Sequence, residues 1–234
     1  MTLTTPTYRV HRAVIAPELE GLWNGQAWAN VPALDVDRFH PRSSSHRPRT
    51  RVKVLRDLRR LYALFRVEDR YVRSVHTAYE SDTYQDSCVE LFVQPRETPG
   101  YFAFEINCGG ALSLRYIEDP TRTANRFARW AAIDRALAAT IRIAHSMPEV
   151  VDPEIVDDVE WWVEMACPLS VLESRCGPLV LADGQRWRAN CFKCADHSSH
   201  PHWASWAPIG EALNFHQPGS FGVFEFVGGF PTAA

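Results

Sequence analysis

Acidic, amide and aromatic side chains occur at alternate positions in two short runs of the chain, 88–94 and 101–107. If both runs are β-strands, Glu90, Glu105 and Asn107 lie on one face, because successive side chains of a strand point to opposite sides. Phe92 and Tyr101 share that face. Carboxylates and amides hydrogen-bond to hydroxyl groups, and aromatic rings pack against C–H faces. This combination predicts a site for a polyhydroxylated ligand such as a sugar.

The opposite face of both runs is apolar. It carries Val89, Leu91, Val93, Phe102, Phe104 and Ile106. The connection 95–100 contains two prolines and a glycine, which is typical of a β-hairpin loop. The sequence therefore predicts a hairpin with one face in a core. A solvated outer face is the alternative for the polar side, since antiparallel sheets commonly have one wet face.

Two later regions could add groups to this site. In the predicted strand 186–194, Arg188 and Asn190 share a face with Arg186 and could lie near the carboxylates of the hairpin. The C-terminal tract WASWAPIGEALNFHQP supplies candidate rings at Trp203, Trp206, Phe215 and His216. The residues predicted to bind the ligand are Tyr84, Glu90, Glu105, Asn107, Arg188, Asn190, Trp206 and His216.

Composition excludes several function classes. The net charge of −3 argues against a nucleic-acid partner, and the basic segment Arg42–Arg60 is interpreted as an edge strand. No run of eighteen apolar residues is present, so no membrane partner is expected. The N-terminus lacks the apolar region of a secretory signal, which predicts a soluble cytoplasmic protein with mostly reduced cysteines.

The elements that must position these residues are mostly short strands. Ten are predicted, at about 8–14, 51–55, 61–67, 88–94, 101–107, 111–116, 140–144, 160–167, 186–194 and 221–227. The spacing of Phe127, Trp130, Ile133 and Leu137 predicts a helix over 125–139, and Pro168 starts a helical turn over 168–173. We expect one domain over residues 1–234, an all-β sandwich of jelly-roll or immunoglobulin-like type with one or two short helices.

Several segments together resemble a known family. LYALFRVED (61–69), YQDSCVELFVQP, YFAFEINCGGALS, WRANCFKC and the tract from Trp203 to Phe226 are similar to the family 9-like carbohydrate-binding modules of the DOMON-like superfamily. The similarity extends from about Trp23 to Phe226. It implies a β-sandwich that holds the end of a glycan between aromatic rings without catalysis, and a structural calcium ion. Neither the signal peptide nor the catalytic domain usual for secreted members is visible.

Metal binding has two candidate locations. The tract CFKCADHSSHPH contains zinc-type ligands, but Cys191 and Cys194 should point to opposite faces of a strand, so zinc is disfavoured. Calcium, which the resemblance implies, prefers oxygen ligands. The carboxylates in or beside suitable loops are Asp69, Asp82, Asp86 and Glu90, and the ligand set stays open.

Two other functions are weighed against non-catalytic sugar binding. Glu90 and Glu105 could serve as the acid pair of a glycoside hydrolase if their carboxyl groups lie about 5–10 Å apart. A haem-binding sandwich would need methionine and histidine ligands across a pocket, and the chain offers only Met1, Met147 and Met165 as methionines. The identity of the saccharide and the oligomeric state are not predicted.

Overall fold

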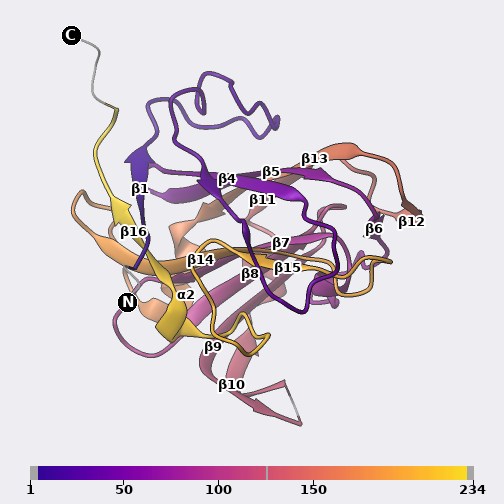
Figure 1. Cartoon of the computed structure of the whole chain (residues 1–234). Coiled ribbons are helices and arrows are strands. Elements are labelled where there is room, and N and C mark those ends of the chain that lie inside the picture. Colours follow the sequence, from indigo (N-terminus) through magenta and orange to yellow (C-terminus); the bar gives the residue numbers. More distant parts are fainter. Residues whose placement is uncertain (1–4, 125, 231–234) are drawn as a thin grey trace.

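Sixteen β-strands provide most of the regular structure in the described part of the computed structural model, residues 5–124 and 126–230 (Figure 1). They are β1 (Thr7–Arg12), β2 (Leu34–Asp35), β3 (Arg38–Phe39), β4 (Arg49–Arg56), β5 (Arg60–Asp69), β6 (Val72–Ser74), β7 (Cys88–Gln94), β8 (Tyr101–Asn107), β9 (Leu112–Thr123), β10 (Arg126–Ala132), β11 (Arg142–His145), β12 (Val151–Ile155), β13 (Val159–Pro168), β14 (Arg186–Cys194), β15 (Trp203–Ser205) and β16 (Gly222–Phe226). The helical elements are α1 (Arg135–Ala138), α2 (Leu169–Cys176) and the 3-10 turns η1 (Thr83–Gln85) and η2 (Pro218–Ser220). A strand is present at each of the ten predicted places.

The strands form two layers that share one strand. The lower sheet of Figure 1 has the order β10-β9-β8-β7-β14-β16, and the upper sheet has the order β4-β5-β13-β11. β1 belongs to both sheets, since Thr7–Val10 pairs in parallel with β16 and His11–Arg12 pairs in parallel with β4. β2 and β15 extend the two sheets, β3 pairs with β15, and β6 pairs with β12. The predicted β-sandwich is confirmed.

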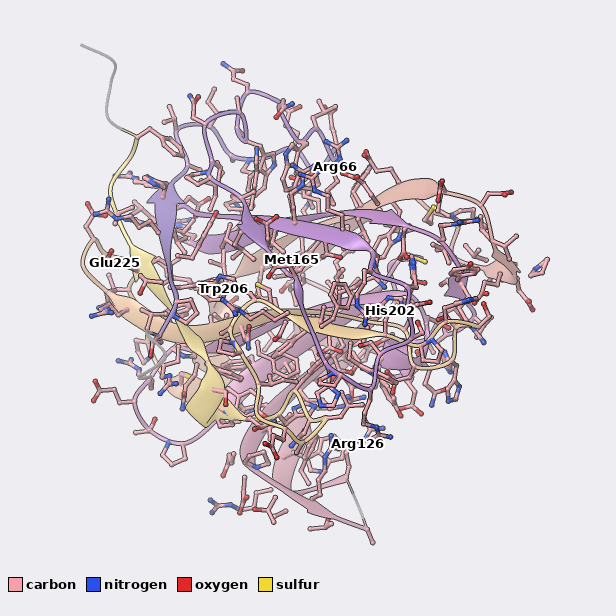
Figure 2. All side chains as sticks on the ribbon, viewed as in Figure 1. Arg66, Arg126, Met165, His202, Trp206 and Glu225 are labelled. Atoms are coloured by element: carbon pink, nitrogen blue, oxygen red, sulfur yellow. The ribbon has the colours of Figure 1, made fainter. Side chains whose placement is uncertain are left out.

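The core fills the space between the sheets, as the alternation predicts. The inward residues of the β7–β8 hairpin are each 2% exposed or less. Met165 of β13 reaches the same core from the upper sheet (Figure 2). On β14, Cys191 faces this core, whereas Cys194 faces the other side of the lower sheet, as predicted. Burial of apolar side chains from both inner faces is the main force that holds the sheets together.

The outer face of each sheet is covered by a loop. The segment 208–221 lies on the lower sheet, where Phe215 stacks on Phe192 with 4.2 Å between ring centroids. The segment 13–33 covers the upper sheet and buries Trp28 there. The polar face of the hairpin is consequently not a wet surface, because Glu90 and Glu105 are each only 3% exposed. Buried carboxylates on a covered face need a structural or functional reason.

A buried ion pair joins the two sheets. Asp69 at the end of β5 lies 3.4 Å from Lys193 of β14, measured from Oδ2 to Nζ, and neither side chain is exposed. Trp161 Nε1 donates to Asp69 Oδ2 at 3.1 Å, and His46 Nε2 lies 2.7 Å from Oδ1. Lys193 Nζ also donates to the Cys194 carbonyl at 3.0 Å. We call Asp69, Lys193, His46, Trp161 and His202 the inter-sheet cluster.

Proton positions in the inter-sheet cluster follow from its contacts. Burial, with Lys193 next to it, lowers the pKa of His202 to about 3, so this ring is neutral at pH 7. Its Nε2, 2.8 Å from Nζ, therefore accepts a hydrogen bond from Lys193. Burial opposes the ionisation of Asp69, but the charge of Lys193 and the His46 contact hold its pKa below the usual range. The Lys193 ammonium thus has two hydrogen-bond acceptors, the Cys194 carbonyl and His202, and an ion-pair partner in Asp69.

The predicted helix over 125–139 is wrong for most of its length. Residues 126–132 form β10, which pairs with β9 as a hairpin, and only Arg135–Ala138 is helical. Phe127 and Ile133 are buried as the helical spacing required, but Trp130 is 38% exposed. The free edge of β9 provides backbone hydrogen bonds to β10, and this pairing prevails over a weak helical pattern. Asn125 lies outside the described residues.

The helical turn predicted at Pro168 is present. α2 begins directly after this proline and ends at Gly177, whose φ of +68° is a conformation that glycine adopts without strain. None of the helices in the described residues is long and apolar enough to cross a membrane.

Candidate functional site

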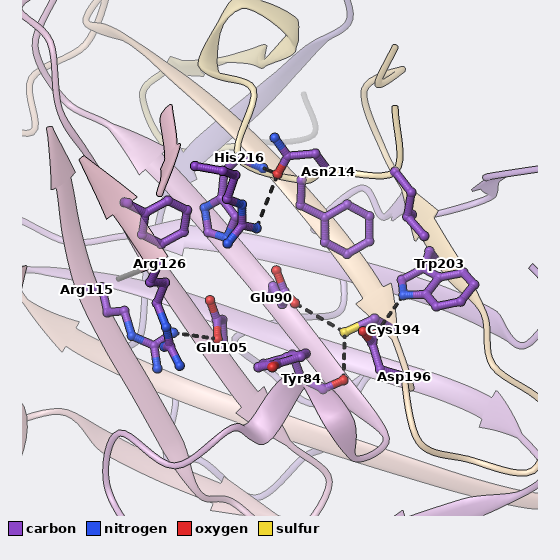
Figure 3. Close-up of a pocket in the computed structure, with 14 residues that line it drawn as sticks. Tyr84, Glu90, Glu105, Arg115, Arg126, Cys194, Asp196, Trp203, Asn214 and His216 are labelled. Atoms are coloured by element: carbon purple, nitrogen blue, oxygen red, sulfur yellow. Dashed lines mark hydrogen bonds and ion pairs between the residues drawn. The ribbon is translucent and has the colours of Figure 1, made fainter. Parts of the chain in front are cut away.

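Glu90 and Glu105 face each other on the outer side of the lower sheet. β7 and β8 pair in antiparallel fashion, with Glu90 directly opposite Glu105. The Cβ atoms of such a pair lie about 4.5–5.5 Å apart, so the carboxyl groups are neighbours (Figure 3). Arg115 Nη1 donates to Glu105 Oε2 at 3.1 Å, and Cys194 Sγ donates to Glu90 Oε1 at 3.2 Å. We call these four residues the pocket cluster.

Burial dominates the acid–base behaviour of the pocket cluster. It raises the pKa of Glu90 well above the usual range, and the neighbouring Glu105 raises it further. Burial also raises the pKa of Glu105, although Arg115 opposes this effect. Because Glu105 has an arginine partner and Glu90 has only a thiol, Glu90 is the carboxyl that holds a proton more readily. A protonated Glu90 can donate a hydrogen bond as well as accept one.

Aromatic side chains from separate segments stand around the carboxyl pair. Tyr84 lies on η1, Trp203 lies on β15, and Phe215 and His216 lie on the loop that covers the sheet (Figure 3). Trp203 Nε1 donates to Asp196 Oδ1 at 2.6 Å, which fixes the plane of the indole. Flat apolar ring faces next to hydrogen-bonding groups match the two kinds of surface on a sugar.

These groups line a cavity of about 240 Å³ on the outer face of the lower sheet. The other lining residues are Arg122, Arg126, Phe127, Asp196, Leu213 and Asn214. Pockets for drug-sized ligands begin at roughly 300 Å³, so this cavity suits a ligand of one or two rings. Four predicted site residues meet in it, namely Tyr84, Glu90, Glu105 and His216.

The two predicted asparagines lie outside the cavity lining. Asn107 is fully buried, and its Nδ2 donates to the His76 carbonyl at 2.7 Å and to Asp86 Oδ2 at 2.9 Å. Asn190 is also fully buried and bonds to both the backbone N–H and the carbonyl of Ala207. Both amides therefore satisfy loop backbone or buried polar groups in the structure.

Arg188 and Trp206 also lie elsewhere. Arg188 Nη2 donates to the carbonyls of Gly219 and Phe221 at 3.0 and 2.9 Å and borders a different hollow. Trp206 is 9% exposed and packs in the inter-sheet core (Figure 2). Trp203 and Trp206 are an odd number of residues apart in an extended segment, so they point in opposite directions, and Trp203 is the one that reaches the cavity.

The sequence interpretation missed much of the cavity wall. Arg115 had a usable signal, because Leu112, Leu114 and Tyr116 alternate with it in a predicted strand, which points Arg115 to the polar side. Arg126 was missed because the segment that contains it was predicted to be a helix rather than a strand next to β9. Asp196 directly follows a strand, and no pattern in the sequence connects it to Trp203.

The four carboxylates considered for calcium have separate partners. Asp82 pairs with Arg126 at 2.7 Å, and Asp86 accepts backbone N–H groups from Val75 and His76. Asp69 belongs to the inter-sheet cluster and Glu90 to the pocket cluster. Among the described residues, no group of three possible metal ligands contains more than one of these four carboxylates. Calcium stays a prediction without a ligand set.

One group of possible metal ligands does meet. Cys88, Glu90 and Cys194 have ligand atoms within 4.8 Å of one another, and all three residues are buried. Cys88 and Cys194 are opposite each other on β7 and β14. Burial raises the pKa of Cys88 to about 11, so this thiol keeps its proton at neutral pH. In that state Cys88 packs as a small apolar group next to Cys194, whose thiol lines the cavity.

The methionines considered for haem binding are not at the cavity. Met165 is 1% exposed in the inter-sheet core, and Met147 packs against the same core. Neither lines the cavity next to His216. Met1 lies outside the described residues.

Comparison with known proteins agrees with the fold and the resemblance. A protein from Bacteroides uniformis, named as a candidate carbohydrate-binding protein, superposes with a TM-score of 0.82 at 24% identity over 95% of this chain and 100% of its own. A carbohydrate-binding module of family 9 from Caldicellulosiruptor kristjanssonii, in complex with cellotriose, superposes with a TM-score of 0.64. The identity is 16% over 98% of this chain and 97% of the module. A family 9 module from the same organism in complex with glucose superposes with a TM-score of 0.61. The identity is 14% over 96% of this chain and 98% of the module.

These likenesses show a shared fold. No curated protein matches the sequence. The sequence model described as carbohydrate-binding family 9 matches residues 26–226, which is most of the chain. The protein is therefore a member of carbohydrate-binding family 9.

Proposed function

We propose that this protein binds a saccharide non-catalytically in the cavity on the lower sheet. The observation that carries the proposal is the convergence of a carboxyl pair, arginines and aromatic rings around one space of about 240 Å³. Membership of family 9 supports the same conclusion. The Caldicellulosiruptor kristjanssonii modules, which share this fold, are described in complex with cellotriose and with glucose.

The lining suggests a division of roles. Tyr84 and Trp203 would pack against the faces of a sugar ring, since both are half-buried at the cavity. Glu90, with its raised pKa, would donate to or accept from a sugar hydroxyl, and Glu105 would accept while Arg115 orients it. Asp196 holds the Trp203 indole and would contribute indirectly.

Hydrolysis is the weaker alternative. The carboxyl groups of Glu90 and Glu105 are close enough for a retaining hydrolase, which places them roughly 5 Å apart. Such an enzyme needs one carboxylate ionised as a nucleophile, whereas burial raises the pKa of both residues here. Family membership also favours binding.

Titration calorimetry with glucose, xylose, cellobiose and cellotriose tests the proposal, with released reducing ends measured in parallel. We expect saturable binding without turnover. Trp203→Ala should weaken binding by roughly tenfold or more, because loss of one packed ring removes about 1.4 kcal/mol or more. Trp162→Ala is the matched control, since Trp162 is a half-buried tryptophan on β13 in the other sheet.

Two outcomes would contradict the proposal. Hydrolysis of cellobiose or cellotriose would contradict non-catalytic binding and point to Glu90 and Glu105 as catalysts. If Trp203→Ala and Trp162→Ala bound as tightly as the wild type, the saccharide would have to bind outside this cavity.

A further inference from the structure

Three arginines form one wall of the cavity. Arg115 and Arg122 lie on β9, and Arg126 lies on β10. Figure 3 shows Arg115 and Arg126 on the same side of the cavity. Arg126 is paired with Asp82 at 2.7 Å. Arg115 is paired with Glu80 at 2.8 Å and with Glu105 at 3.1 Å. Two of the three guanidinium groups are therefore at least partly neutralised by carboxylates.

Arg122 is different from the other two. Among the described residues no carboxylate forms an ion pair with it. Its contacts are a hydrogen bond to Asn214 Oδ1 at 3.5 Å and the ring of Phe127, whose centroid lies 4.5 Å from the guanidinium carbon. Both contacts belong to neighbours at the cavity, so Arg122 brings a positive charge to this wall without a built-in counter-charge.

Arg115 has a hydrogen-bond donor to spare. Its side chain is 3% exposed, and Nη2 is buried without a hydrogen-bond partner among the described residues. A buried donor of a charged group without a partner costs roughly 1–3 kcal/mol or more, so such groups are rare unless something else supplies the acceptor. Arg115 lines the cavity while Nη2 itself is covered, so in this structure the guanidinium acts on a ligand in the cavity through its charge.

Burial weakens the acids on the opposite side of the cavity. Burial raises the pKa values of Glu90 and Asp196, which favours their neutral forms. His216 lies near the arginines, and burial together with the charges of Arg122, Arg115 and Arg126 lowers its pKa well below the usual range. The ring is neutral, and the three positive charges that act on it converge at this end of the cavity.

We propose that the saccharide bound here is anionic, with a carboxylate or phosphate group that contacts Arg122 and lies in the field of the neighbouring Arg115. This inference rests on the proposed function of the same cavity. Guanidinium groups bind carboxylate and phosphate through paired, charge-assisted hydrogen bonds. The sugar ring would then lie toward Tyr84 and Trp203, which line the same cavity. A uronic acid and a sugar phosphate share this chemistry.

Calorimetry with glucose, glucuronate and glucose 6-phosphate at low and high salt tests the inference. We expect at least one anionic sugar to bind roughly tenfold tighter than glucose, because one charge-assisted hydrogen bond adds about that much affinity. The advantage should shrink at high salt, since screening weakens an exposed arginine most. The tighter of the two anionic sugars identifies which anionic group the wall takes.

Equal affinity for glucose and both anionic sugars would overturn this inference and leave the proposed function intact. Failure of every sugar to bind, neutral ones included, would overturn the proposed function itself. In Arg122→Gln, the ratio of anionic to neutral affinity should fall toward one. Arg129→Gln should leave that ratio unchanged, because Arg129 is an exposed arginine of β10 that does not line the cavity.

Discussion

The inter-sheet cluster and the pocket cluster are both buried groups of charged residues, but their hydrogen bonding differs. In the inter-sheet cluster, both oxygens of Asp69 have hydrogen-bond partners, and Lys193 has two hydrogen-bond acceptors besides its ion pair with Asp69. In the pocket cluster, Nη2 of Arg115 has no partner, and the donor found for Glu90 is a weak thiol. The carboxylates of both clusters lie on strands of the same sandwich, Asp69 on β5 and Glu90 and Glu105 on β7 and β8.

The difference shows how a binding site can be distinguished from a structural polar cluster. Buried polar groups that are fully hydrogen-bonded hold a fold in one arrangement, whereas unsatisfied ones raise its free energy. The pKa shifts follow this division, since Asp69 is shifted down by its partners and Glu90 is shifted up by burial. An unsatisfied cluster that lines a cavity is therefore where a ligand would provide the missing partners.

The largest effect that tests this comparison is expected from Lys193→Met. Removal of one partner from a buried ion pair leaves an uncompensated charge and costs about 3–5 kcal/mol. Urea unfolding at pH 7 measures the change in the free energy of unfolding. The other lysine of the chain, Lys53, is the matched control, because it is buried and forms no ion pair among the described residues; its Nζ donates to the carbonyls of Trp23 and Trp28 and lies over the Trp23 ring.

Lys53→Met should cost less than Lys193→Met, since a hydrogen bond to a neutral carbonyl that loses its partner costs about 1–3 kcal/mol. If both variants lost the same stability, or if Lys193→Met lost less than Lys53→Met, the ion pair of the inter-sheet cluster would stabilise the fold no more than contacts to neutral carbonyls do.

A second, smaller effect concerns pH and has opposite signs in the two clusters. The pKa of Glu90 is raised in the folded state, so the folded protein binds more protons than the unfolded chain above the ordinary value of 4.5. Stability falls as the pH rises through that window. Glu90→Gln should thus be more stable than the wild type at pH 8, by roughly 1 kcal/mol or about 2–4 °C in Tm, and similar at pH 4.

Asp69→Asn should show the reverse pattern. The pKa of Asp69 is lowered in the folded state, so its contribution is complete above the ordinary value of 3.8 and is lost as the pH falls below it. This variant should be less stable than the wild type at pH 7, with a difference that narrows in acid. Thermal unfolding between pH 3 and pH 8 measures both variants, and parallel curves would contradict the assignment of opposite pKa shifts.

Strand periodicity explains how much of this could be predicted from the sequence. Alternation correctly placed Glu90 and Glu105 on one face of a hairpin, because the two-residue period is a local property of the chain. The covering of that face by 208–221 depends on long-range packing, which no local pattern encodes. The arginine wall was missed for the same reason, since Arg126 joins it only because β10 pairs with β9.

Arg188 illustrates the limit of periodicity within one strand. β14 lies beside β7, so the expectation that its polar face is near the carboxylates was reasonable. Register decides the rest, because Arg188 is opposite Gln94 whereas Phe192 is opposite Glu90. Alternation gives the face on which a residue lies but not its position along the strand.

The smallest effect is therefore expected from Arg188→Gln. Its guanidinium is exposed and donates only to the carbonyls of Gly219 and Phe221 among the described residues, so the free energy of unfolding should change by about 0.5 kcal/mol or less. Sugar affinity should change by less than twofold, because Arg188 borders a different hollow. Calorimetry should measure the sugar affinity of Arg188→Gln and Arg122→Gln together. The two variants are comparable because Arg188 and Arg122 are both exposed arginines on the lower sheet. A loss of affinity in Arg188→Gln as large as in Arg122→Gln would extend the binding surface along β14, beyond the cavity.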